Sequence, residues 1–458
     1  MKTQNPKPMK IIKTLTKTES TNTDSKTRQH SGLTQALLVS LLLAGIPVAA
    51  KAQTVPADPD TFLTFLEHFQ QEDATTARAY YKAVDPLNKR TTAAAWAKNA
   101  GFIASEAGYV PVGSLGNPGD NEARANSTSF ALYQNAADLG FIRRMFIRVV
   151  GGFGATNPDI YSYVENYFYR ADLADPYSDA RNRMNRIATV AFEWVAAADG
   201  SNPGKKFGTM YTFDGNDQRE TGGVPFAPDL DGRGAKQQPG ACLVCHGGFP
   251  SALVNGAYPN KGEIKGFKFL PFDLDNFEYD TIDPLLSRAA QEPAFKRFNR
   301  AVLLTHKGKA SVDDQGVTRQ PAGKELILGW YGGAGLPGDF DNEFIPQGWR
   351  EPVHGGTAPP YSEILYLNTI RPACRACHVQ QELSLDLATQ KGFMAQADNI
   401  NELVLRVECG LSDSTAGRDD RKVMPQALLT YERFWKDPAQ VNTLKAYLLL
   451  QGKPFTCP

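Results

Sequence analysis

The sequence predicts a mainly α-helical protein, with an N-terminal helical domain followed by two further domains. Three observations support this fold class. Apolar residues recur at three- and four-residue steps over long stretches, a length of 458 residues allows several cores, and one short cysteine motif occurs twice in the C-terminal half. The predicted domains are 53–203, 204–359 and 360–458, behind a segment 1–52 of different composition.

Residues 1–52 are predicted to be a secretory signal peptide. A polar, basic stretch precedes an apolar run from Leu33 to Ala50, and Ala50-Lys51-Ala52 has the small residues of a cleavage site, with cleavage after Ala52. The long basic stretch also fits a start at Met9 or an N-terminal anchor. The sequence contains no later apolar run long enough to span a bilayer, so we expect a periplasmic or secreted protein without stable membrane insertion.

The charge balance differs between the leader and the rest of the chain. Residues 1–52 contain 8 Lys and Arg against 2 Asp and Glu, whereas the other 406 residues contain 41 against 47, a formal charge of −6. Nucleic-acid binding requires an excess of basic side chains, so this function is not expected. If electrostatics guide docking, a protein partner is expected to present a basic face.

The region 53–203 is predicted to be an all-α domain of unknown role. The stretches Phe62–Phe69, Ala131–Val150 and Ser178–Ala198 carry apolar residues at three- and four-residue steps. A short strand is predicted only beyond this region, at Met210–Phe213, followed by a turn at Asp214-Gly215-Asn216.

The repeated cysteine motif predicts the chemistry. Both copies have the pattern C-x-x-C-H, which attaches c-type haem: two thiols three positions apart form thioethers with the vinyl groups, and the next imidazole binds the iron. The sequence therefore predicts two covalent haem c groups and two haem-binding domains. The expected attachment residues are Cys242, Cys245, Cys374 and Cys377, and the expected proximal ligands are His246 and His378.

The last hundred residues resemble a class I cytochrome c domain. A predicted helix from Tyr361 leads into the second motif, a loop carries Met424-Pro425, and a closing helix runs from Pro438 to Leu450. The resemblance implies that Met424 is the distal ligand of the second haem. Met394, 16 positions after His378 and in a predicted helix, is the alternative.

The distal ligand of the first haem is left open by the sequence. His354 lies in a Gly- and Pro-rich loop between the two motifs and could reach the iron. The alternatives are His306 at a predicted helix end, a methionine such as Met210 or Met184, and an open position.

The distal position of the first haem, occupied or open, separates two classes of function. Two six-coordinate haems predict an exported electron-transfer cytochrome with a redox partner protein, whereas an open first haem predicts a peroxidase-like or oxygenase-like enzyme. The domain order resembles the di-haem cytochrome c peroxidases, which implies a catalytic first haem and a higher-potential second one. An aromatic residue often lies between the haems in that family; Trp330 and Trp349 are candidates here, with core packing as their other role. No catalytic residue is assigned.

Two further cysteines, Cys409 and Cys457, lie outside the motifs. In an oxidising compartment they are expected to form a disulfide, and two free buried thiols are the alternative.

Overall fold

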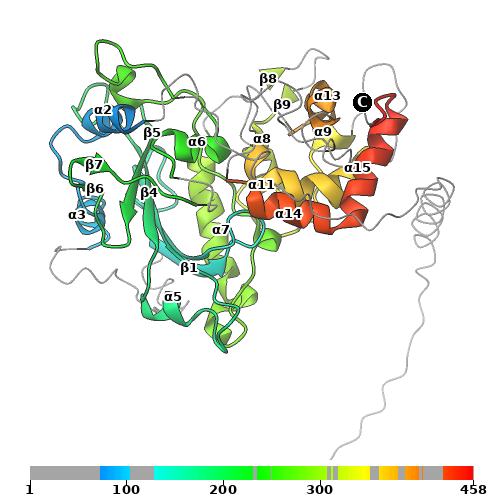
Figure 1. The fold of residues 1–458 in the computed structure, drawn as a ribbon, viewed down its shortest axis with the longest axis horizontal. Coiled ribbons are helices and arrows are strands. Elements are labelled where there is room, and N and C mark those ends of the chain that lie inside the picture. The colour runs from blue at the N-terminus through cyan, green and yellow to red at the C-terminus, as the bar shows by residue number, and fades with distance from the viewer. Residues whose placement is uncertain are drawn as a thin grey trace, which may run out of the picture. The chain divides into compact units, whose positions relative to one another are not determined.

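A five-stranded antiparallel sheet occupies the N-terminal half of the structure, a computed structural model (Figure 1). The structure describes residues 73–103, 128–230, 235–248, 250–306, 311–312, 318–350, 361–379, 387–401, 405 and 426–456. The strands follow one another in space in the order β1 to β5. They are β1 (Thr128–Gln134), β2 (Ile142–Val149), β3 (Ile160–Tyr167), β4 (Ala188–Val195) and β5 (Phe207–Asp214).

This sheet shows that the prediction of a mainly α protein with an all-helical N-terminal domain is wrong. The predicted helix Ala131–Val150 is most of β1, a turn and β2, and the predicted helix Ser178–Ala198 is the short helix α5 (Ser178–Asn182) followed by β4. In β1, all residues after Thr128 are buried. A strand buried on both faces is apolar along most of its length, so its pattern cannot be told from that of a buried helix by periodicity alone.

The prediction of a strand at Met210–Phe213 is confirmed, because β5 contains it. The turn that follows is also present: Asp214 Oδ1 accepts hydrogen bonds from the backbone N–H groups of Asn216 and Gln218, at 2.9 and 2.8 Å. An aspartate that binds the backbone two residues onward is typical of such turns.

Both edges of the sheet are covered by side chains. At β1, the Gln291 amide on helix α7 (Arg288–Thr305) accepts from Leu132 N at 2.7 Å and donates to Leu132 O at 2.8 Å. At β5, the hydroxyls of Tyr80 and Tyr81 on helix α2 (Ala74–Val84) accept the N–H groups of Met210 and Thr212. These bonds satisfy backbone groups that would otherwise be free to pair with another chain.

The two faces of the sheet have different surroundings. On one face, Phe146 and Tyr163 stack with ring centroids 4.6 Å apart, and Arg144 forms a fully buried ion pair with Glu165 at 3.1 Å. Helix α3 (Ala93–Asn99) contributes Trp96 to this side. The other face carries the cavity described below.

Between β5 and the C-terminal region, the chain forms mostly short elements besides α7. These are the two-residue strands β6 (Glu220–Thr221), β7 (Val224–Pro225), β8 (Ser311–Val312) and β9 (Thr318–Arg319), the 3-10 turns Pro259–Gly262, Leu274–Asn276 and Pro284–Leu286, and the helices α6 (Gly240–His246) and α8 (Ala322–Trp330).

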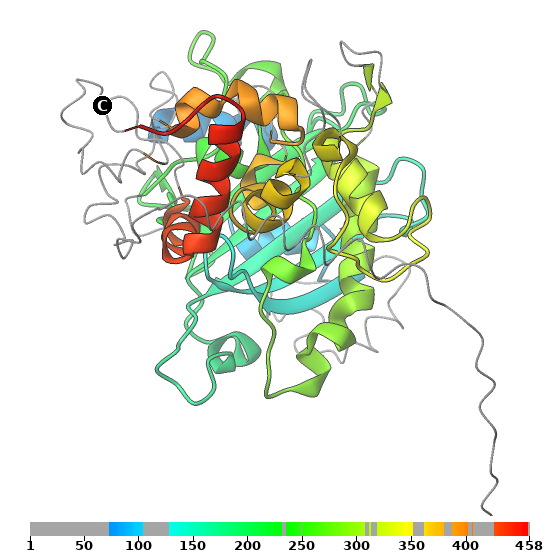
Figure 2. The same ribbon diagram turned by 90° about the vertical axis from the view of Figure 1, so that its right-hand side faces the viewer.

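The C-terminal region is helical, and its helices group together (Figure 2). The expected helix from Tyr361 into the second motif is confirmed as three consecutive pieces, α10 (Tyr361–Leu365), a π-helical stretch Tyr366–Cys374 and α11 (Arg375–His378). The expected closing helix is confirmed as α15 (Pro438–Leu450). The remaining helices are α9 (Gln347–Arg350), α12 (Gln390–Ala395), α13 (Ala397–Ile400) and α14 (Leu428–Lys436).

Candidate functional site

The first C-x-x-C-H motif forms helix α6 itself. Cys242 and Cys245 lie one helical turn apart, and His246 is the last residue of the helix. The helix ends at Gly247, which has φ +74°. At Gly248, with φ +86°, a Cβ atom would lie 2.9 Å from Lys265 O, so the chain passes too close to this backbone for a larger residue. The sequence after the motif therefore turns sharply and fixes the end of the helix.

His246 has the environment of a metal-ligating imidazole. Its Nδ1 lies 2.9 Å from the backbone oxygen of Lys268, whereas Nε2 makes no hydrogen bond within the described part of the chain. A ligating histidine commonly donates its other ring N–H to a backbone carbonyl, which fixes the tautomer and the ring orientation. Burial lowers the pKa of His246 to about 4, an effect that the Lys268 hydrogen bond opposes and the charge of Arg143 reinforces.

Two aromatic rings hold this imidazole in place. The Phe192 ring contacts it edge-on, with centroids 4.6 Å apart, and the Phe267 ring lies nearly parallel at 5.5 Å. Gly208 on β5 leaves space for the Phe267 ring, because a Cβ atom there would lie 2.1 Å from it. The position of His246 is thus set by the sheet as well as by its own helix.

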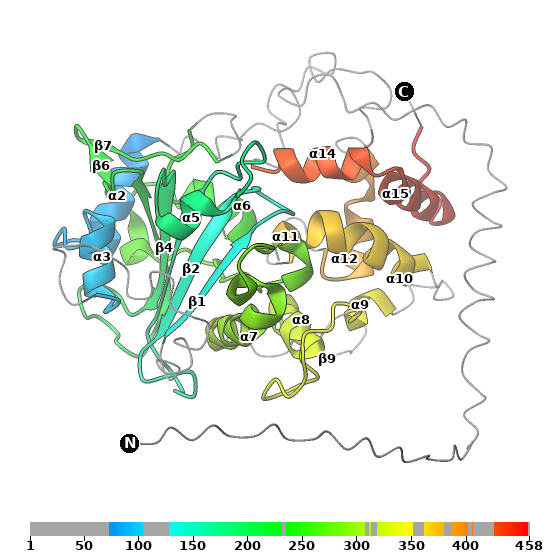
Figure 3. The same cartoon turned by 90° about the horizontal axis from the view of Figure 1, so that it is seen from below.

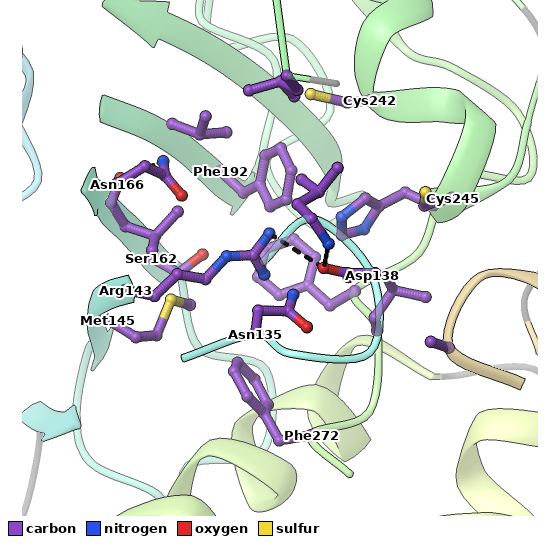
Figure 4. A pocket seen from close by; sticks show the side chains of 18 of the residues that line it. Asn135, Asp138, Arg143, Met145, Ser162, Asn166, Phe192, Cys242, Cys245 and Phe272 are labelled. Atoms are coloured by element: carbon purple, nitrogen blue, oxygen red, sulfur yellow. Dashed lines mark hydrogen bonds and ion pairs between the residues drawn. The ribbon is translucent and has the colours of Figure 1, made fainter. Parts of the chain in front are cut away.

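A cavity lies between α6 and the sheet (Figure 4). Its volume is about 1240 Å³, including open space at the mouth; most ligand sites measure roughly 300–1,000 Å³. Cys242, Cys245 and His246 line it together with apolar side chains from three strands and from the segment 269–273. The apolar lining includes Ile147, Val164, Val190, Phe192, Phe269, Leu270, Pro271 and Phe272. Two thiols, an imidazole and apolar walls are the groups that a covalently attached haem requires.

One corner of the cavity is polar. Arg143 on β2 points toward Asp138 in the β1–β2 loop, with Arg143 Nη2 3.8 Å from Asp138 Oδ1, and Asn135 lies in the same corner (Figure 4). Burial tends to lower the pKa of Arg143, but Asp138 and Tyr133 outweigh it, so the pKa lies above its ordinary value. A charged guanidinium therefore faces a mainly apolar cavity.

The second motif begins where the π-helical stretch ends. Cys374 closes that stretch, and Cys377 and His378 lie on α11. Between these cysteines, the buried Arg375 donates to Asp273 Oδ2, to Tyr366 Oη and to Asn342 Oδ1. Its guanidinium also lies over the Trp330 ring, 5.2 Å from the centroid. Arg375 thus ties the second motif to the segment that lines the first cavity.

The fold brings the two motifs side by side (Figure 3). Cys245 Sγ and Cys377 Sγ are 3.5 Å apart, although 132 positions separate them in the chain. Ala376 of the second motif and Gln426 line the first cavity, and the Gln426 amide donates to the backbone oxygen of Ala241 on α6. Since both sulfurs belong to expected attachment residues, haems bound at the two motifs would lie next to each other at the contact between Cys245 and Cys377.

Helix α14 supports the polar corner from outside. Thr430 Oγ1 donates to Ala137 O at 2.6 Å, and the Arg433 guanidinium donates to Ala136 O. Both oxygens belong to the β1–β2 loop that carries Asn135 and Asp138.

Several predicted site residues lie outside the described residues: His354, Met424, Cys409 and Cys457. Their predicted roles stay predictions. His306 is described: it follows α7 as predicted, and its Nε2 lies 3.0 Å from Phe269 O, while the described residues that line the cavity do not include it.

The other candidates have core positions. Trp349 packs in the C-terminal core and donates its Nε1–H to Leu387 O at 3.1 Å, and Trp330 is buried beneath Arg375. Met394 packs against the same C-terminal core, Met210 is buried in β5, and Met184 is half exposed.

Sequence reasoning missed the polar corner. Arg143, Asp138 and Asn135 lie inside the segment Ala131–Val150, which the sequence predicts to be helical, and a helix there gives them no place in a haem site. The available signal was the content of β-branched and aromatic residues in the stretches that form β2, β3 and β4.

No protein-family model, curated protein or solved structure matches this chain. Its function is therefore inferred from the geometry of the two motifs. Among the described residues, no helix has both the length and the apolar character needed to cross a bilayer.

Proposed function

We propose that this chain is an exported di-haem c-type cytochrome that transfers electrons through two adjacent, covalently bound haems. The observation that carries the proposal is the contact between the two motifs, with Cys245 Sγ and Cys377 Sγ 3.5 Å apart. Covalent attachment at both C-x-x-C-H motifs would hold the two haems close enough to each other for electron transfer.

The first site fits the cofactor. Cys242 and Cys245 would hold the vinyl positions, and His246 is neutral, oriented by Lys268 O and placed at the cavity wall. When bound, haem supplies a centre that accepts and releases one electron at a time. The chain's own contribution is to exclude water with apolar walls and to keep the imidazole in the ligating tautomer.

The second site would use Cys374, Cys377 and His378, with Met424 as the proposed distal ligand. A thioether ligand raises the reduction potential of a haem, so electrons would rest preferentially at this site. A partner protein with a basic face remains the proposed electron donor or acceptor, in keeping with the −6 formal charge of residues 53–458.

The test is direct. The chain is expressed in a bacterial periplasm with the haem-attachment machinery, and the purified protein is analysed by mass spectrometry and by haem staining after denaturing electrophoresis. Two covalent haem increments are expected, and Cys242→Ala/Cys245→Ala and Cys374→Ala/Cys377→Ala variants should each lose one. A mass without haem would contradict the proposal.

A further inference from the structure

The polar corner of the first cavity has a feature that electron transfer alone does not require. Arg143 is the one cationic side chain among the described residues that line the cavity. It lies near the start of β2, next to the edge strand β1. On the same face, the next β2 residue, Met145, is apolar, and the cross-strand neighbours are Tyr133 and Asn166. A buried cation in such surroundings needs a negatively charged or hydrogen-bond-accepting partner.

Asp138 does not fully provide that partner. The Arg143 Nη2 to Asp138 Oδ1 distance of 3.8 Å is longer than a hydrogen bond, and the same Oδ1 already accepts the backbone N–H of Leu139. The Arg143 Nε–H is buried and makes no hydrogen bond within the described residues. The Tyr133 hydroxyl, opposite Arg143 across β1 and β2, also accepts a hydrogen bond from the guanidinium. A guanidinium has five N–H donors, so Asp138 and Tyr133 together leave donors for a ligand in the cavity that Arg143 lines.

The surroundings of Arg143 place these donors on the cavity side of the first motif. Arg143, the Cys245 thiol and the His246 imidazole all line the same cavity. The Asn135 and Ser162 side chains line the same cavity. Among the described residues that line the cavity, His246 is the one histidine and Met145 is the one methionine.

We propose that the first haem binds a small anionic ligand on its cavity side, and that Arg143 holds the negative charge of that ligand. This inference rests on the proposed di-haem function. The ligand class is a small anion with a hydrogen-bond-accepting atom next to the iron. A guanidinium suits this role because it stays charged and offers several donors in one plane. The first site would then be a ligand-binding centre, and the second would exchange electrons with it.

The experiment uses the ferric di-haem protein, titrated with sodium fluoride and with sodium azide and followed by its optical spectrum. The ferrous protein is titrated with carbon monoxide, a neutral ligand that does not depend on a cation. Wild type is compared with Arg143→Leu and Arg143→Lys. Arg148→Leu is the control, because Arg148 lies on the same strand, does not line the cavity and donates to Ala100 O.

We expect Arg143→Leu to weaken the binding of the anions and to leave the binding of carbon monoxide nearly unchanged. Loss of one charge-assisted hydrogen bond weakens binding by about 10- to 100-fold, so the fluoride and azide dissociation constants should rise by that factor in Arg143→Leu. Carbon monoxide affinity should change by less than about twofold, Arg143→Lys should recover part of the anion affinity, and Arg148→Leu should behave as wild type.

Three outcomes would overturn the inference. Equal anion affinity in wild type and Arg143→Leu would show that Arg143 does not hold the ligand. A loss of haem content or a shifted haem potential in that variant, with unchanged anion affinity, would assign Arg143 to a haem propionate. Wild-type protein that binds no ligand, while Met145→Leu does, would make Met145 the sixth ligand. In each case two haems in the mass spectrum of the wild-type protein would leave the proposed function intact.

Discussion

The guanidinium of Arg375 and the carboxylate of Asp273 form an ion pair that joins the two candidate sites. Arg375 Nε lies 3.0 Å from Asp273 Oδ2, and both side chains are buried. Burial raises the pKa of Asp273, although Arg375 acts in the opposite direction. Arg375 belongs to the second motif and Asp273 to the lining of the first cavity, so the pair fixes the geometry between them.

We expect Arg375→Met to destabilise the protein by about 3–5 kcal/mol, because it leaves Asp273 buried without its cation. The free energy of unfolding is measured by denaturant titration. The double variant Arg375→Met/Asp273→Leu should recover much of the loss. Arg371→Met serves as the control, since its partner Glu343 is 72% exposed and exposed pairs contribute only about 0–1 kcal/mol. A single variant as stable as wild type would contradict the role of this pair.

The C-terminal helices were predictable because their signals are local. Asp437-Pro438 marks a helix start that needs no tertiary context: Asp437 caps α15 by accepting from Ala439 N, and proline occupies the first position. The sheet was not predictable in the same way. A strand such as β1 is buried on both faces by packing against parts of the chain that are distant in sequence, helix α7 among them, and that packing is a property of the whole fold.

The same distinction between local signals and tertiary packing applies to the candidate site. The proposed attachment residues Cys242 and Cys245 follow from a short motif with fixed spacing, so the sequence predicts them directly. Arg143 reaches the cavity only through the register of β2 between β1 and β3, and the contact of Cys245 with Cys377 depends on how the motifs pack. No local pattern encodes either relationship.

Gln291→Leu should destabilise the sheet edge. The Gln291 amide pairs with both backbone groups of Leu132, and leucine of similar size would leave that donor and acceptor without partners. Each unsatisfied buried group costs about 1–3 kcal/mol, so a loss of about 2–4 kcal/mol is expected. Thermal and denaturant unfolding measure it, with the exposed Gln347→Leu as the control. If hydrogen exchange at Leu132 stays as slow as in wild type, the edge interaction is not needed.

His246→Gly should change one haem and leave the other as it was. The thioethers would retain the haem, but its iron would lose the imidazole that Lys268 O orients, so the spectrum of that haem should change. Added imidazole should restore it, because the vacated space lies between the Phe192 and Phe267 rings. His378→Gly is the reciprocal variant and should affect the second haem alone. Equal changes of both haems in either variant would refute the assignment.

Met424→His should lower one of the two midpoint potentials and leave the other nearly unmoved. A thioether favours ferrous iron more than an imidazole does, so exchanging the ligand stabilises the ferric state of the second haem only. Met394→Leu is the matched variant, because Met394 packs against the C-terminal core and its loss should leave both potentials close to wild type. Potentiometric titration separates the two haems. A shift caused by Met394→Leu instead would make Met394 the ligand, and equal shifts of both potentials with Met424→His would exclude Met424 as a ligand of one haem.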